Sequence, residues 1–246
     1  MKATQFEFRF RLLIILLLYM LGFWAPWTWT AGHYGPPATT AWLAIPTLLD
    51  RWGWMRLDQA SLVMTWLAIV FGVVGAALRV WGTAYLSAAV VHSDAMHGDR
   101  VMASGPYRYV RNPLYVGSLL LGMSIAILMP PSGAAVFVVL LALFYFRLIL
   151  GEEAFLAGQS GQAYLDYKRQ VPRLVPKLSP RIPAGPAHPE WGMSLVAEIF
   201  PVAFAICLAA LAWRYQPRLL VQCLLISFGM SLVLRAFLPK KQAAGA

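Results

Sequence analysis

Residues 114–150, LYVGSLLLGMSIAILMPPSGAAVFVVLLALFYFRLIL, form two apolar runs separated by the segment 129–133, MPPSG. Arg147 is the one charged residue in this stretch. Proline and glycine between the runs favour a tight turn, and each run approaches the length of roughly 20 residues that crosses the hydrocarbon core of a bilayer. The stretch therefore predicts an antiparallel pair of membrane helices, over residues 114–130 and 134–150.

The rest of the chain is also strongly apolar. Hydrophobic residues make up 60% of its 246 residues and charged residues 12%, whereas soluble domains have roughly half and a quarter. Four further apolar runs cover residues 8–28, 60–81, 194–213 and 219–237. We therefore predict an all-α, polytopic membrane protein with about six transmembrane helices. The segment 38–50 is too short to span and contains Pro46, so we expect it to lie at the membrane interface.

The basic residues are unevenly distributed between the two sides of such a bundle. With six spans and the N-terminus inside, 16 of the 20 Lys and Arg residues fall on the cytoplasmic side, as the positive-inside rule requires. Both termini and the polar segments 92–113 and 151–193 are then predicted to be cytoplasmic. The net charge of +10 is explained by this topology and by contact with anionic headgroups of membrane lipids, so we expect no nucleic-acid partner.

The histidines and cysteines do not predict a metal site. His92 and His97 are isolated in a polar loop, and Cys207 and Cys223 lie within apolar runs. None of them has the spacing of a metal-ligand motif. We therefore expect no metal.

Two polar segments, 92–113 and 151–181, flank the helical hairpin and are therefore predicted to meet in space. Residues 153–170 have the pattern of a helix with an apolar side. Val171-Pro172 should end that helix, because the residue before proline disfavours helical geometry. Residues 179–190 are rich in proline and predict a connector to the last two helices.

The first of these segments contains residues 105–115, GPYRYVRNPLY, directly before a membrane helix. Gly105-Pro106 favours a turn, and Asn112-Pro113 suits a helix start with Asn as the cap and Pro in the first turn. Free backbone amides, Arg111 and several tyrosines would then gather at a helix N-terminus, which suits an anion. The alternative is an ordinary interfacial belt of Tyr and Arg.

The second segment follows Arg147 and begins with Glu152 and Glu153. Ionisable residues beside membrane-buried surface are costly and are more often functional than decorative. Arg147 and Glu152 are five residues apart, so they would not form the favoured i, i+4 pair of a helix, although both could line one cavity. The alternative is a cluster of charges in headgroup water at a helix end.

Together these motifs resemble the isoprenylcysteine carboxyl methyltransferases and their phospholipid N-methyltransferase relatives. The family signature G-x-Y-x-x-x-R-H-P-x-Y corresponds to residues 105–115. In the family it is followed by a helical hairpin, Glu-Glu, a Gly-x-x-Tyr-x-x-Tyr segment and Val-Pro. Residues 152–153, 161–167 and 171–172 supply these parts in order. The resemblance covers roughly residues 98–178.

The resemblance implies an S-adenosylmethionine-dependent methyltransferase with a cytosolic pocket built from loops, acting on a lipophilic acceptor that arrives from the bilayer. The implied cofactor contacts are Tyr107, Asn112, Pro113, Leu114, Tyr115 and Glu152, together with Asp99, Arg100, Val101 and Met102. Arg111 and Glu153 lie within the same motifs and are included in the predicted cofactor site. Arg147 matches an arginine on the acceptor side, so Arg147 and Glu152 are the predicted catalytic residues.

Two positions depart from the family pattern. Asn112 stands where the family usually has His, and Asp99 falls where relatives often carry another His. Asparagine keeps a hydrogen bond but does not titrate near neutral pH, so position 112 is not expected to act as a general base.

Three parts of the chain follow from these motifs. Residues 1–91 would hold N-terminal membrane helices and the interfacial segment, 92–181 the methyltransferase core with its cofactor pocket, and 182–246 a C-terminal transmembrane hairpin.

One alternative function is that of an NADPH-dependent reductase of the sterol or steroid type, which resembles this family in its last helices. Another is a membrane transporter or assembly protein without enzymatic activity. The candidate acceptors include a prenylated cysteine carboxylate, a phospholipid amine, and a lipophilic thiol or phenol.

Overall fold

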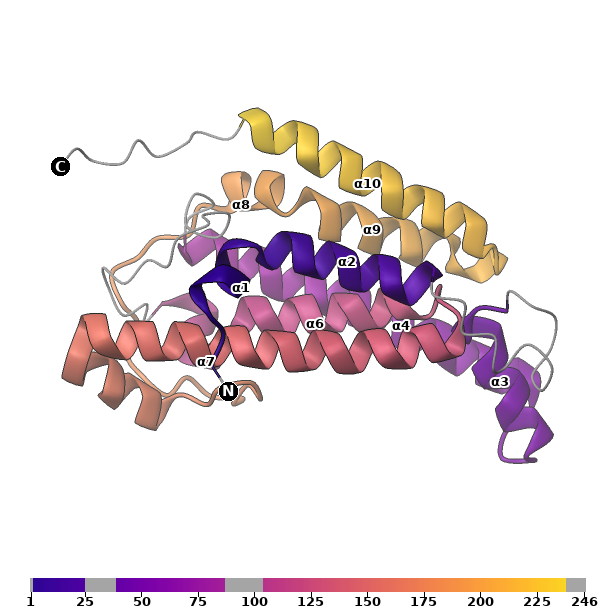
Figure 1. The fold of residues 1–246 in the computed structure, drawn as a ribbon, viewed down its shortest axis with the longest axis horizontal. Coiled ribbons are helices and arrows are strands. Elements are labelled where there is room, and N and C mark those ends of the chain that lie inside the picture. The colour runs from indigo at the N-terminus through magenta and orange to yellow at the C-terminus, as the bar shows by residue number, and fades with distance from the viewer. Residues whose placement is uncertain (1, 25–38, 87–103, 238–246) are drawn as a thin grey trace.

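The computed structural model describes residues 2–24, 39–86 and 104–237, and in these ranges the chain forms helices and no strand (Figure 1). The elements are α1 (Gln5–Arg9), α2 (Arg11–Trp24), α3 (Ala41–Arg51), α4 (Leu57–Leu86), η2 (Gly105–Arg108), α6 (Pro113–Ala126), α7 (Pro131–Gln170), α8 (Trp191–Ala197), α9 (Ile199–Leu211), η3 (Ala212–Arg214) and α10 (Pro217–Phe237). The predicted all-α fold is confirmed for this part of the chain.

The helices differ in their capacity to cross a membrane. Among the described residues, Leu57–Leu86, Pro131–Gln170 and Pro217–Leu234 are long and apolar enough to span. Trp191–Ala197 and Ile199–Arg214 are long and apolar enough to span when taken together, but they are bent by 76° at the break between them. Helices α2 and α6 have 14 residues each, about 21 Å at 1.5 Å per residue, which is short of the roughly 30 Å hydrocarbon core. These helices indicate a multi-pass membrane protein with three spans, or four with the bent pair; the predicted six are not confirmed.

The predicted hairpin is formed by α6 and α7, which lie side by side (Figure 1). Its turn covers residues 127–130, slightly earlier than the predicted 129–133, because α6 ends at Ala126 and Pro131 and Gly133 already lie in the first turn of α7. Helix α3 packs on this turn: the amide of Ala41 donates to the carbonyl of Met129 at 2.7 Å. The short segment that contains Pro46 is therefore a helix at one end of the bundle (Figure 1).

Helices α4 and α6 approach closely at a pair of glycines. A Cβ atom on Gly75 would lie 2.7 Å from the carbonyl oxygen of Gly117, and one on Gly117 would lie 2.7 Å from that of Gly75. Small residues of this kind let helix backbones come together in a membrane. The contact brings Arg79, one turn after Gly75, next to Ser118 on α6.

The end of α7, from Gly161 to Gln170, turns away from the rest of the helix (Figure 1). Gly161 has φ 55° and ψ −129°, so the helix predicted over residues 153–170 is continuous with the hairpin helix and kinked at this glycine. It ends at Gln170, before Val171-Pro172, as predicted.

The two polar segments meet, as their positions around the hairpin predicted. The amide of Arg111 donates to the carbonyl of Pro172 at 2.8 Å, and the amide of Lys177 donates to that of Tyr109 at 3.1 Å. The hydroxyl of Tyr167 donates to the carbonyl of Tyr107 at 2.8 Å. Residues 104–113 are thus fastened to the end of α7 and the chain after it, whereas 92–103 lie outside the described residues.

Candidate active site

A cavity of about 890 Å³ opens inside the helical bundle. Eight of the predicted cofactor residues line it: Tyr107, Arg111, Asn112, Pro113, Leu114, Tyr115, Glu152 and Glu153. Helices α6 and α7 carry most of them. The other four predicted residues, Asp99, Arg100, Val101 and Met102, lie outside the described residues.

Glu152 is held at the cavity by Tyr115. The Tyr115 hydroxyl, in the first turn of α6, is hydrogen-bonded to the Glu152 carboxylate on α7. Arg11 on α2 also lines the cavity and lies within electrostatic range of Glu152. A carboxylate in this position can face a cationic group of a ligand.

Glu153 is the centre of a buried ion-pair network. Its carboxylate accepts two hydrogen bonds from Arg173, at 3.0 and 2.9 Å, and lies 3.2 Å from Arg111 Nη1 and 3.8 Å from Lys168 Nζ. Its side chain is 3% exposed. The network ties α7 to Arg111, which precedes α6, and to Arg173, which follows α7, and removing a carboxylate surrounded in this way leaves cations without compensation.

Arg111 keeps unused hydrogen-bonding capacity. Its side chain is 8% exposed, and within the described part of the chain its Nε and Nη1 atoms have no hydrogen-bond acceptor of good geometry, despite the nearby Glu153 carboxylate. A buried donor without an acceptor is costly. Because Arg111 lines the cavity, these donors suit an anionic group of a ligand.

Asn112 stands at the predicted helix start, but its side chain does not cap α6. Its Nδ2 atom instead donates to the carbonyl of Arg173 at 3.1 Å and lies 3.4 Å from Glu153 Oε1. The predicted capping hydrogen bond is therefore wrong. The tertiary contacts with Arg173 and Glu153 hold the amide, and neither could be seen from the local sequence.

Arg147 is not among the residues that line the cavity. Its Nε and Nη2 atoms donate to the carboxylate of Glu7 at 3.1 and 2.9 Å, and its carbonyl accepts from the amide of Ala3 at 3.0 Å. The guanidinium holds the pKa of Glu7 at about 2, well below its ordinary value. Arg147 thus fastens α1 to α7, and this geometry gives its predicted role on the acceptor side no support.

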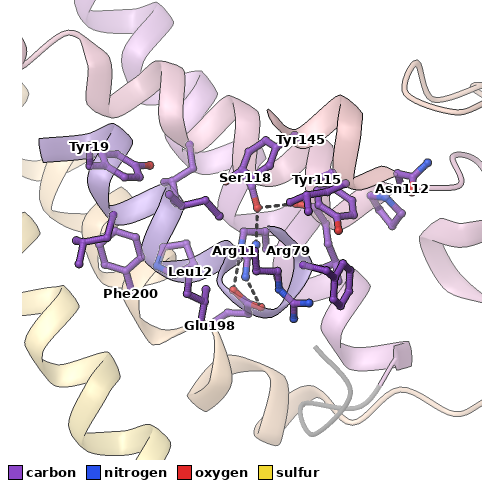
Figure 2. Close-up of a pocket in the computed structure, with 18 of the residues that line it drawn as sticks. Arg11, Leu12, Tyr19, Arg79, Asn112, Tyr115, Ser118, Tyr145, Glu198 and Phe200 are labelled. Atoms are coloured by element: carbon purple, nitrogen blue, oxygen red, sulfur yellow. Dashed lines mark hydrogen bonds and ion pairs between the residues drawn. The ribbon is translucent and has the colours of Figure 1, made fainter. Parts of the chain in front are cut away.

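The sequence motifs missed a second polar group on the cavity wall. Arg79 Nε and Nη2 donate to the Glu198 carboxylate at 2.7 and 2.9 Å, and Arg79 Nη1 donates to Ser118. Figure 2 shows Arg79, Ser118 and Glu198 in the middle of the pocket, between Asn112 on one side and Phe200 on the other. The signal that could have found them is their charge, because both ionisable residues lie within predicted membrane spans.

Much of the remaining wall is apolar and comes from α2 and α10. Leu12, Leu13, Leu16 and Met20 of α2 line it, together with Leu225, Phe228 and Leu232 of α10. No group of three or more His, Cys, Asp or Glu that could hold a metal occurs among the described residues. The site therefore combines charged groups at one end and in the middle with a hydrocarbon-like surface beyond them.

Part of the cavity lining lies in a region that is similar to a known protein family. The model of the phospholipid methyltransferase family matches residues 63–163. Residues 63–163 are therefore similar to that family. The match confirms the resemblance predicted from the motifs, and it contains α6, most of α7 and the part of α4 that carries Arg79. Glu198 lies beyond it.

One curated relative also matches. The cobalt-zinc-cadmium resistance protein CzcN of Cupriavidus metallidurans is 32% identical over 132 residues, which are 53% of this chain and 56% of that protein. The chain thus aligns with little more than half the length of this relative. No solved structure matches the chain.

Proposed function

We propose that this membrane protein transfers a methyl group from S-adenosylmethionine to a lipophilic acceptor. The observation that carries the proposal is the presence of Arg111 and Glu152 in the lining of one cavity. S-adenosylmethionine has a carboxylate, an ammonium and a sulfonium, so it offers an anion to the unused donors of Arg111 and cations to Glu152. The family match over residues 63–163 supports the same activity.

The residues around the cavity suit the physical needs of methyl transfer. When bound, the cofactor supplies an electrophilic methyl group, which moves to the acceptor as its bond to sulfur breaks and a neutral sulfide is left. The protein has to hold donor and acceptor in line and keep water away. The polar end formed by α6 and α7 would bind the donor, and the apolar wall from α2 and α10 would bind the acceptor.

Several predictions from the motifs remain part of this proposal. Tyr107, Asn112, Pro113, Leu114 and Tyr115 would contact the cofactor from the start of α6, and residues 99–102 would complete the pocket. The division at residues 91 and 181 also stays a prediction. The positive-inside rule favours a cytoplasmic position for the polar end.

Ligand binding to the purified full chain in detergent tests the proposal. Calorimetric titration with S-adenosylhomocysteine should show saturable binding, and NADPH should show none. Lipid extract incubated with the protein and methyl-labelled S-adenosylmethionine should yield a labelled lipophilic product, identified by mass spectrometry. Binding of NADPH without binding of S-adenosylhomocysteine would instead favour a reductase.

A further inference from the structure

The ion pair of Arg79 and Glu198 has no net charge, and this affects which acceptor headgroup the cavity can bind. Glu198 lies at the bend between α8 and α9 and is 1% exposed. Two of its hydrogen bonds come from Arg79, and a third comes from the Thr83 hydroxyl at 2.7 Å. The guanidinium and the carboxylate therefore neutralise one another, although both line the cavity.

A neutral pair discriminates against charged ligands. A carboxylate placed beside Arg79 would have to compete with Glu198 for the guanidinium and would be repelled by Glu198. An ammonium beside Glu198 would likewise have to compete with Arg79 for the carboxylate and would be repelled by Arg79. Both would lose their hydration on entering the cavity, and this cost is recovered only by a good unpaired counter-charge.

Uncharged hydrogen-bonding groups meet no such penalty. Tyr19 and Tyr145 also line the cavity and lie within electrostatic range of Arg79. Tyr145 is hydrogen-bonded to Ser118, which also accepts from Arg79. The pair, which has no net charge of its own, thus lies among uncharged donors and acceptors between Asn112 and Phe200 (Figure 2). The nearby Arg11 has Glu152 as a counter-charge.

We propose that Arg79 and Glu198 form the recognition site for the acceptor headgroup, and that this site takes an uncharged hydroxyl or thiol in preference to a carboxylate or an ammonium. The inference rests on the proposed methyl transfer. Methylation of a hydroxyl or thiol forms an O–CH3 or S–CH3 bond, breaks the sulfonium C–S bond and releases the acceptor proton to the solvent. Methylation of a carboxylate releases no proton.

Four probes with one alkyl chain separate these headgroups: 4-dodecylphenol, dodecanethiol, dodecanoate and dodecylamine. Binding to the full chain in detergent is measured with saturating S-adenosylhomocysteine, which would occupy Arg111 and Glu152, and turnover is measured with labelled S-adenosylmethionine in weak buffer. We expect the phenol or thiol to bind at least tenfold more tightly than dodecanoate and dodecylamine, with one proton released per methyl transferred. Tighter binding of dodecanoate, or transfer without proton release, would overturn the proposal, as would a preference for dodecylamine.

Substitutions in the pair test its charge balance. Glu198→Gln should leave Arg79 without its counter-charge and shift the binding ratio towards dodecanoate by tenfold or more. Thr83→Val removes one hydrogen bond from Glu198 without changing charge, so it should keep the order of preference. If Glu198→Gln does not fold, the double variant Arg79→Gln/Glu198→Gln, which is again neutral, should still prefer the phenol or thiol over dodecanoate. An unchanged ratio in folded Glu198→Gln would contradict the role of the pair.

S-adenosylhomocysteine binding separates this inference from the proposed function. Wild type and all three variants should bind it with affinities within a few-fold of one another, because the pair lies outside the predicted cofactor residues. Loss of binding in every protein, wild type included, would count against methyl transfer itself. Normal binding combined with a preference for a charged probe would count against the headgroup proposal alone.

Discussion

Glu152 and Glu153 are adjacent in the sequence but have different environments. Glu152 faces the cavity with one hydrogen bond from Tyr115. Glu153 lies among Arg111, Arg173 and Lys168, so it is engaged within the protein. Substituting these two glutamates one at a time can therefore distinguish an effect on ligand binding from an effect on stability.

Glu152→Gln should weaken S-adenosylhomocysteine binding by roughly ten- to a hundredfold, since a hydrogen bond to a charged group is worth about 1.5–3 kcal/mol and tenfold in affinity is about 1.4 kcal/mol. Its melting temperature in detergent should change little. Glu153→Gln is the matched comparison: it should lower the free energy of unfolding by about 3 kcal/mol, because the buried Arg111 and the partly exposed Arg173 and Lys168 lose their counter-charge. Calorimetry and thermal unfolding of both variants measure the contrast. Loss of affinity in Glu153→Gln alone, at unchanged stability, would reverse the two roles.

The Glu7–Arg147 ion pair predicts a dependence of stability on pH. The pKa of Glu7 is lowered to about 2 in the folded protein, against about 4.3 in an unfolded chain. The pair should therefore add its full stability, about 1 kcal/mol for a partly exposed pair, above the unfolded value and lose it as the pH falls towards 2. The gap in melting temperature between wild type and Glu7→Gln should accordingly be constant at neutral pH and close below about 4.3.

The same pair tests the acceptor role predicted for Arg147. If Arg147 acts only by fastening α1, Arg147→Ala and Glu7→Gln should lower methyl transfer to a similar degree, and the double variant should be no worse than either. A drop in turnover confined to Arg147→Ala would restore a direct role for the guanidinium.

At the scale of the elements, the kink in α7 depends on one glycine. Gly161 has φ 55° and ψ −129°, a region that side chains with a Cβ rarely adopt, while the space around it is open. Gly161→Ala should therefore cost roughly 1–3 kcal/mol through backbone strain alone. Gly158 is the control, because it is helical and equally open, so Gly158→Ala should be neutral or stabilise by up to about 1 kcal/mol. Equal melting temperatures of the two variants would contradict the kink.

The close contact of α4 with α6 also positions the site. Gly75 and Gly117 let the two backbones touch, and Arg79 reaches Ser118 and Glu198 from this contact. The polar group in the middle of the cavity thus depends on small residues one turn away from it.

At the scale of the whole molecule, the polar end of the bundle is predicted to face the cytoplasm. Leu178 follows α7 and is fully exposed, and Arg56 precedes α4 with 77% of its side chain exposed. In a background of Cys207→Ser and Cys223→Ser, a membrane-impermeant thiol reagent added outside intact cells should label Arg56→Cys and not Leu178→Cys. Opening the cells should expose the second site. Labelling of both from one side would contradict the predicted topology.

The sequence by itself determined the local features of this protein. The two apolar runs of the hairpin, a turn next to Pro130-Pro131, the end of the helix before Val171 and the meeting of the two polar segments all follow from composition and chain order. Glycine, proline and hydrophobic periodicity act over a few residues, so they can be read without a structure. The motifs also identified eight residues that line one cavity.

Only the tertiary structure decided which charged groups are partners. Glu198 pairs with Arg79 from 119 residues away, and Arg147 pairs with Glu7 from 140 residues away. In the sequence these residues were charges near helix ends, and Glu198 carried no motif at all. An ion pair depends on the separation of two side chains after packing, and the packing of α1, α4, α7 and α9 is set by shape and close contact across the bundle. Neither the separation of two side chains nor the packing of the helices produces a periodic pattern in the sequence.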